Sequence, residues 1–88
     1  MSDSAFRALA DPTRQRILEL LAGGDRTAGQ LADEFAITFA SVSHHLRVLR
    51  EAELVTAERE GQNIRYRLNT TVVQDVTRYL MRLLQGKK

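Results

Sequence analysis

Cysteine is absent from the 88 residues of this chain. Disulfide bonds and thiolate metal sites are therefore excluded, and a reducing compartment is permitted. Long apolar runs are also missing, since none approaches the roughly 20 residues that span a bilayer. The first four residues, MSDS, lack the basic start of a secretory signal. We therefore expect a cytoplasmic protein that is neither inserted into a membrane nor processed.

An excess of charge of one sign is lacking as well, because the formal net charge is only +2. This value is weak evidence for a nucleic-acid partner, and an ordinary mixed surface explains it equally well. The charges are uneven, however: residues 1–35 carry four Arg against six Asp or Glu, and residues 69–88 carry four Lys or Arg against one Asp. Local motifs, rather than composition, must indicate the function.

The length allows one domain, which we assign to residues 1–88 because no repeat, linker or low-complexity segment divides the chain. A domain of this size buries only about 60% of its unfolded surface, so its core is marginal without a supplement. Pairing with a second copy is the simplest supplement.

Capping signals divide the first part of the chain into three short helices. The first ends at Asp11-Pro12, where Asp11 also caps the second, and Gly23-Gly24 stops the second. Thr27 and Gln30 form a capping box for the third. The expected apolar faces are, in order, Phe6, Leu9 and Ala10; Ile17, Leu18 and Leu21; and Leu31, Ala32 and Phe35.

The segment 41–50 has the division of side chains that a DNA recognition helix requires. One side of such a helix is anchored in the core, and the other enters a groove about 12 Å wide. Thr38 can cap this helix, which we expect from about Phe39 to Ala52, after a three-residue turn that indicates a helix-turn-helix. At 100° per residue, the core side holds Val42, Leu46 and Leu49, and the opposite side holds Ala40, Ser43, His44 and Arg47.

A hairpin follows, because a β-like stretch opens at Leu54 and alternation resumes after the turn at 60–63. Ile64, Tyr66 and Leu68 form the half-buried side of its second strand, and Arg65 and Arg67 form the open side. These arginines suit contacts with DNA phosphates or with a minor groove. The alternative is a solvated strand face on which Glu58 and Glu60 balance them.

Helical spacing returns beyond Asn69, with a stripe that is closed by Gly86 and a Lys87-Lys88 tail. The whole order is α-α-α-α-β-β-α, which predicts a mainly α winged helix-turn-helix with a small β-hairpin. The stripe is broad for the end of so small a domain, so part of it needs a partner; the alternative is that it packs on its own core. The stripe consists of Val72, Val76, Tyr79, Leu80, Leu83 and Leu84.

Two segments, FRALADPTRQRIL at 6–18 and VSHHLRVLREA at 42–52, resemble the arsenical-resistance repressor (ArsR) family of bacterial winged-helix regulators. The resemblance extends from Phe6 to about Leu84. The hairpin of such a fold is called the wing, and its turn here contains Gly61-Gln62-Asn63. This turn and the Leu68-Asn69-Thr70-Thr71 segment are similar to the corresponding segments of the small SdpR-type autorepressors, which lack a metal site. The resemblance implies a homodimer held by the first and last helices, through Phe6, Leu9, Val76, Tyr79, Leu80 and Leu83.

The resemblance also implies which residues contact DNA. Ser43 and His44 match the family's base-reading positions, and Arg47 holds a phosphate or a base edge. Ser41 is a phosphate ligand candidate. His45 lies on the flank of the core side, where packing is the simpler role. The remaining expected DNA contacts are Thr38, Gln62, Arg65 and Arg67.

Many relatives have Gln-Ser where this chain has Phe39-Ala40, so the family's base code does not transfer to these two positions. A contact between Ala40 and a thymine methyl group is one hypothesis.

Other kinds of function fit less well. Metal-sensing relatives place a Cys pair where this chain has Leu31-Ala32-Asp33-Glu34, and the adjacent His44 and His45 diverge by about 100°, so we expect no metal and no cofactor. Ser41 and His45 lack a third catalytic group, so we expect no enzyme activity. An interaction module that binds another protein instead of DNA is the alternative.

The sequence therefore predicts a homodimeric transcriptional repressor that binds an inverted-repeat operator in double-stranded DNA, with its own promoter as a candidate target. Three signals could relieve repression: a small molecule, a partner protein, or a change in the concentration of the repressor itself.

Overall fold

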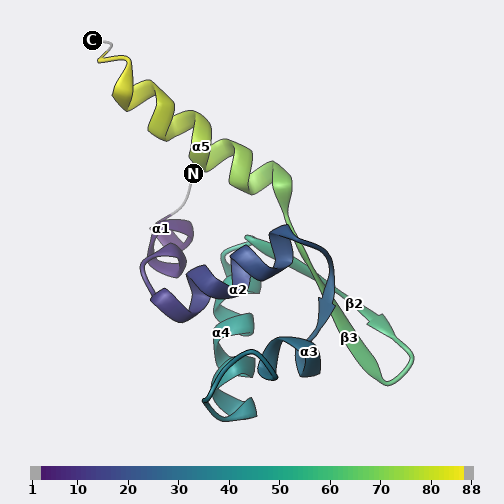
Figure 1. Cartoon of the computed structure of the whole chain (residues 1–88). Helices are drawn as coiled ribbons and strands as arrows, with labels where there is room; N and C mark the ends of the chain where they lie inside the picture. Colours follow the sequence, from purple (N-terminus) through teal and green to yellow (C-terminus); the bar gives the residue numbers. More distant parts are fainter. Residues whose placement is uncertain (1–2, 87–88) are drawn as a thin grey trace.

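A computed structural model describes residues 3–86 of the chain, and the Lys87-Lys88 tail therefore lies outside it. Residues 3–86 form five helices and three strands in the order of a winged helix-turn-helix, as predicted (Figure 1). The elements are α1 (Asp3–Leu9), α2 (Pro12–Ala22), β1 (Arg26–Thr27), α3 (Ala28–Ala32), α4 (Phe39–Glu51), β2 (Val55–Glu60), β3 (Asn63–Leu68) and α5 (Thr70–Leu84).

The predicted caps are present at the start of three helices. The Arg14 amide donates to Asp11 Oδ2 at 3.0 Å, and the Ser41 amide donates to Thr38 Oγ1 at 3.0 Å. Thr27 and Gln30 form the full capping box, with bonds of 2.9 and 3.2 Å. These side chains satisfy amides that have no partner within their own helices, so local sequence determines where each helix begins.

The sheet has three antiparallel strands in the order β1-β3-β2, whereas the sequence predicted two. The additional strand, β1, has only two residues, and Arg26 pairs with Tyr66 while Thr27 pairs with Arg65. A strand this short has no periodicity, so the prediction missed it. Strands β2 and β3 are paired from Val55↔Leu68 to Glu60↔Asn63, as the predicted hairpin requires.

The core lies between α2, α3, α4 and the base of the sheet. Val42, Leu46 and Leu49 on α4 are 0–1% exposed, which confirms the predicted core side of this helix. Leu20 is buried as well, although the predicted stripe of α2 omitted it. The largest fully buried side chains are Ile17, Leu31, Leu46, Leu49, Leu54, Val42 and Val55.

The predicted apolar face of the first helix is wrong. Ala5 and Ala8 are its buried residues, at 2% and 0% exposed, while Phe6 is 38% exposed and Ala10 is exposed outside the helix. Small side chains let α1 approach the core closely, and Phe6 is left on the outer surface. Only Leu9 of the predicted set packs against the core cluster.

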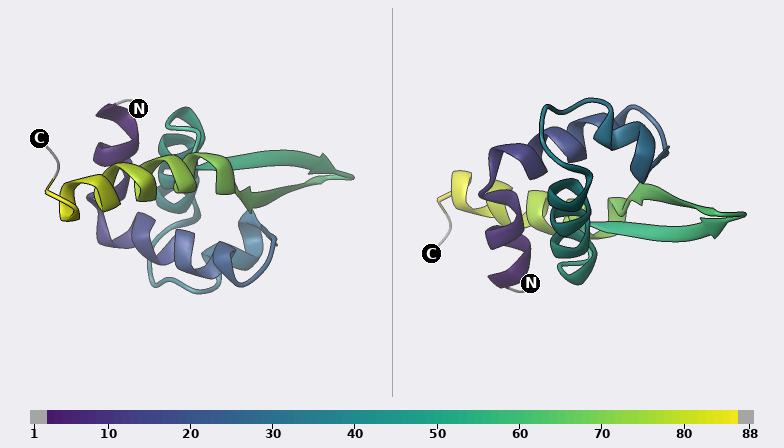
Figure 2. Two further views of the ribbon diagram at one scale, coloured as in Figure 1. Left: turned by 90° about the horizontal axis from the view of Figure 1, so that it is seen from above. Right: turned by 90° about the horizontal axis from the view of Figure 1, so that it is seen from below.

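The wing and α5 extend away from this core, so the molecule measures 50 × 24 × 21 Å along its principal axes (Figure 2). Val72 and Val73 at the start of α5 pack against the core cluster. Within α5, whose residues all lie in the described range, Val76 is the single buried side chain. None of the helices formed by residues 3–86 is long and apolar enough to cross a membrane.

Candidate nucleic-acid interface

The outer side of α4 carries the residues expected to read DNA. His44 and Arg47 are exposed, and Ser41 and Ser43 are partly buried at its edges. Arg47 Nη2 lies 3.2 Å from His44 Nδ1. A guanidinium can only donate, so this distance suits a hydrogen bond from Arg47 to the His44 ring. The two side chains are therefore oriented together on the exposed face.

His45 points to the opposite flank, as predicted, and its side chain is 15% exposed. Its Nδ1 accepts a bond from Arg14 Nη1 at 3.1 Å and lies 3.8 Å from Asp11 Oδ2. Burial lowers the pKa of His45 and the Arg14 charge lowers it further, whereas the Asp11 carboxylate opposes these effects. A neutral His45 therefore accepts from Arg14 and has a packing role.

Arg14 connects three parts of the fold, which the sequence did not indicate. Besides its contact with His45, its Nε donates to the Ala8 carbonyl at 2.8 Å, and its Nη2 donates to the Arg7 carbonyl at 3.2 Å. These carbonyls belong to the last turn of α1, and the Arg7 carbonyl also accepts the Ala10 amide at 3.1 Å. Arg14 thus attaches the end of α1 to the recognition helix.

The open face of the hairpin contains the two predicted wing arginines, and both have carboxylate partners. Arg65 Nε lies 3.1 and 3.2 Å from the two Glu60 oxygens, and these hydrogen bonds, followed by the Glu60 charge, raise the pKa of Arg65. Arg67 Nε lies 3.0 Å from Asp25 Oδ2. Glu60 was named in the alternative interpretation of this face, but Asp25, which lies between α2 and β1, was not.

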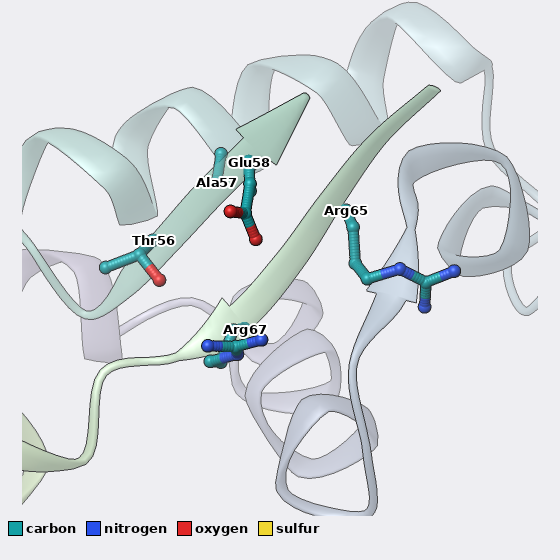
Figure 3. A pocket seen from close by; sticks show the side chains of 5 residues that line it. All are labelled: Thr56, Ala57, Glu58, Arg65 and Arg67. Carbon is teal, nitrogen blue, oxygen red and sulfur yellow. The ribbon is translucent and has the colours of Figure 1, made fainter. Parts of the chain in front are cut away.

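A shallow hollow on this face is lined by both arginines and by residues of β2 (Figure 3). Arg65 extends away from Glu58, its register partner, and toward β1, where its Nη1 lies 3.5 Å from the Asp25 carbonyl. A phosphate that binds either arginine must therefore compete with a carboxylate of the chain itself.

Arg59 is a wing residue that the prediction missed. It lies opposite Ile64 in the β2–β3 register, near the turn that contains Gln62. Its side chain is exposed and forms no hydrogen bond or ion pair with any residue in the described part of the chain. Period-two alternation from Val55 places it on the opposite sheet face from Arg65 and Arg67, a signal that could have identified it.

The predicted dimer residues divide into three groups. Val76 is 6% exposed and has little surface left for a partner, and Leu9 is partly buried. Phe6 and Tyr79 pack edge to face within the chain, with ring centroids 5.8 Å apart, yet each keeps over a third of its surface exposed. The exposed apolar residues of α5, two of which the prediction omitted, are Leu80 at 48%, Met81 at 51%, Leu83 at 59% and Leu84 at 82%.

Two parts of the candidate interface lie at one end of the molecule, remote from α5 (Figure 1). In Figure 1, the first turn of α4 and the tip of the hairpin lie at the bottom, and α5 lies at the top. Among residues 3–86, no three His, Cys, Asp or Glu side chains are placed to share a metal ion.

Comparison with known proteins gives matches over the helix-turn-helix and over most of the chain. Residues 11–57 match the model of the family described as bacterial regulatory protein, arsR family. The transcriptional repressor SdpR of Bacillus subtilis is 48% identical over 82 residues, which cover 93% of this chain and 91% of SdpR.

Two further matches have the same family character. The HTH-type transcriptional regulator CmtR of Mycobacterium tuberculosis is 52% identical over 62 residues, 70% of this chain, and the chain spans about half of its length, 52%. An ArsR-like transcriptional regulator from Rhodococcus sp. RHA1 has a similar structure, with a TM-score of 0.82 and 32% identity over 94% of this chain and 78% of that one. The chain therefore belongs to the ArsR family of bacterial regulatory proteins, which are winged-helix, DNA-binding transcription regulators and not enzymes.

Proposed function

We propose that this protein is a homodimeric repressor that occupies an inverted-repeat operator in double-stranded DNA. The observation that carries the proposal is the opposite placement of two unpaired surfaces. The exposed apolar side of α5 is at one end of the molecule, and the first turn of α4 and the wing tip are at the other. Two copies joined through α5 would keep both DNA-facing regions free.

The α5 surface suits a second copy of the chain. A contiguous exposed apolar patch on a small protein marks an interaction site, and a two-fold axis buries the same patch on both copies. Leu80 and Leu83 supply the apolar centre of the contact, and Phe6 and Tyr79 form its aromatic edge. Two recognition helices related by this axis read half-sites about one helical turn apart, which requires an inverted repeat.

Within each half-site, Ser43, His44 and Arg47 contact base edges or phosphates in the major groove. Ser41 and Thr38 lie at the helix start, where amides attract phosphate. Gln62 at the wing tip and Arg59 beside it reach the adjacent backbone or minor groove. Arg65 and Arg67 also bind phosphate, Arg65 after it leaves Glu60 and Arg67 after it leaves Asp25. Repression agrees with the function of SdpR, and a DNA target implies a cytoplasmic location.

We further propose that this repressor does not sense metals. The chain has no cysteine, and α3 carries no ligand pair on its buried side. A small molecule, a partner protein or dilution of the repressor then ends repression. Zinc titrated into the repressor–operator complex should leave it intact, and release of DNA at stoichiometric zinc would refute this part of the proposal.

The central test combines sedimentation with selection of bound DNA fragments. The wild-type chain should sediment as a dimer and select an inverted repeat, and its affinity should fall steeply with salt as counterions are released. Leu83→Glu should be monomeric and bind poorly. Gln74→Glu adds the same charge at an exposed position of α5, about 200° from Val76, and should stay dimeric.

Two results would overturn the proposal. If a monomer binds a single half-site with full affinity, the proposed homodimer is refuted. Binding that is absent, or that has no salt dependence, would favour the alternative of a protein-interaction module.

A further inference from the structure

The first turn of the recognition helix exposes apolar side chains to solvent. Phe39, the first residue of α4, is 57% exposed, Ala40 beside it is exposed, and Ile37 in the preceding turn is 41% exposed. By contrast, Phe35 packs against the core cluster. The core contacts of α4 are supplied by Val42 and the residues further along the helix. The chain's own packing therefore does not account for Phe39.

The position of Phe39 is where recognition helices meet base edges. In a helix-turn-helix, residues near the N-terminus of the second helix contact the bases in the major groove. Phe39 precedes Ser43 by one helical turn, and Ala40 precedes His44 by the same spacing, so the apolar turn is continuous with the polar reading face. It also lies at the end of the molecule that is remote from α5 (Figure 1).

Few polar groups are available at this turn. The Thr38 hydroxyl already accepts the Ser41 amide at 3.0 Å, and Ser41 itself is only partly exposed. Phe39 and Ala40 have no side-chain donor or acceptor. Their partner on DNA must therefore be apolar, and the major groove presents one such group, the C5-methyl of thymine.

We propose that Phe39, with Ala40 beside it, reads thymine C5-methyl groups, so each operator half-site carries thymine under the first turn of α4. The proposal rests on the operator binding proposed above. Discrimination between thymine and the other bases has two sources. Covering a methyl group removes apolar surface from water, and covering a purine or cytosine edge leaves a hydrogen-bonding group without a partner.

Deoxyuridine provides a direct test, because it pairs like thymidine but lacks the methyl group. The operator selected by the wild-type dimer is resynthesised with one thymidine at a time replaced by deoxyuridine, and affinity is measured at fixed salt. At one or two positions in each half-site the substitution should weaken binding roughly fourfold, the equivalent of about 0.8 kcal/mol for one buried methyl group. The other thymidines should tolerate it.

Variants identify the side chain that is responsible. Phe39→Ala should bind the normal operator more weakly and lose the deoxyuridine effect at those positions, and Phe39→Leu should keep most of it. His44→Ala should weaken binding yet leave the deoxyuridine effect unchanged. Because Phe39 is more than half exposed, its replacement should not alter the fold, which thermal unfolding verifies.

The outcomes separate the two proposals. If no sequence is selected, the proposed DNA-binding function fails and this inference fails with it. If an operator is selected but every deoxyuridine substitution is neutral, or if the effect persists in Phe39→Ala, operator binding stands and the reading of thymine by Phe39 is wrong. If Phe39→Ala changes the sedimentation of the DNA-free protein, Phe39 contacts another protein copy and the inference is likewise refuted.

Discussion

Asp25 pairs with one of the wing arginines, and its replacement tests whether that arginine contacts DNA. Asp25 Oδ2 lies 3.0 Å from Arg67 Nε, and the two side chains are 33% and 61% exposed. Asp25→Asn removes the negative charge and nearly preserves the shape of the side chain. We expect this variant to bind the operator more tightly and to show a steeper loss of affinity with salt.

The size of the effect follows from the exposure of the pair. Two unit charges at 3.0 Å in bulk water attract by about 1.4 kcal/mol, but side-chain entropy and salt screening reduce exposed pairs to roughly 0.2–1 kcal/mol. Releasing Arg67 from this pair should therefore improve operator affinity by up to about fivefold for each subunit, or up to about 25-fold for the dimer on both half-sites. Two additional neutralised phosphates, one for each subunit of the dimer, should steepen the slope of log affinity against log salt by about 1.8.

Fluorescence anisotropy of a labelled operator over a salt series measures both quantities. Asp75→Asn is the matched control, because Asp75 pairs with Arg78 on α5 at the same 3.0 Å, remote from the proposed DNA surface. It changes the net charge equally. If the two variants shift affinity and slope by the same amounts, the effect is one of net charge, and Arg67 does not bind phosphate.

Further predictions concern stability and the wing. Leu49→Ala removes a fully buried side chain and should lower the free energy of unfolding by about 2–5 kcal/mol in urea titrations; a loss below about 1 kcal/mol would contradict the core described above. Burial lowers the pKa of His45 below its ordinary value, so the folded state binds fewer protons than the unfolded state. The stability that neutral His45 allows should therefore be complete above about pH 6.5, the ordinary histidine pKa, and should fall as the pH drops below that value toward the lowered pKa of the folded state. Thermal unfolding from pH 7.5 to 5.5 should show a smaller loss in His45→Gln, and equal losses would exclude His45 as the cause. Arg59→Ala should reduce operator affinity and flatten the salt slope, whereas Arg16→Ala, which removes an exposed arginine from α2, should do so much less; the reasoning about the free wing arginine fails if the two variants behave alike.

The predicted helix starts agree with the structure because a cap acts over three or four residues. Asp11, Thr27 and Thr38 each bond an amide three positions ahead, so the sequence contains both partners. The core side of α4 was predictable for a similar reason. Its period brings Val42, Leu46 and Leu49 together whatever the rest of the fold does.

The misassigned features depend on contacts between distant segments. Periodicity placed Phe6 on the inner face of α1, but close packing against the core selected the smaller Ala5 and Ala8 instead. The two-residue strand β1 exists only because β3 lies beside it. Neither the buried face of α1 nor the strand β1 can be predicted from a local window of sequence.

By itself, the sequence determined the order of the five helices and the hairpin, the caps, and the polar side of the recognition helix, because each depends on residues that are close in the chain. The tertiary structure decided which charged groups are free to meet DNA. Asp25 is 42 positions from Arg67, and only the antiparallel sheet brings them together. The same folding attached Arg14 to His45, 31 positions away, and left Arg59 without a partner in the described part of the chain. Electrostatic pairing depends on distance in space, and in this small domain the sheet and the packing of α2 against α4 set those distances.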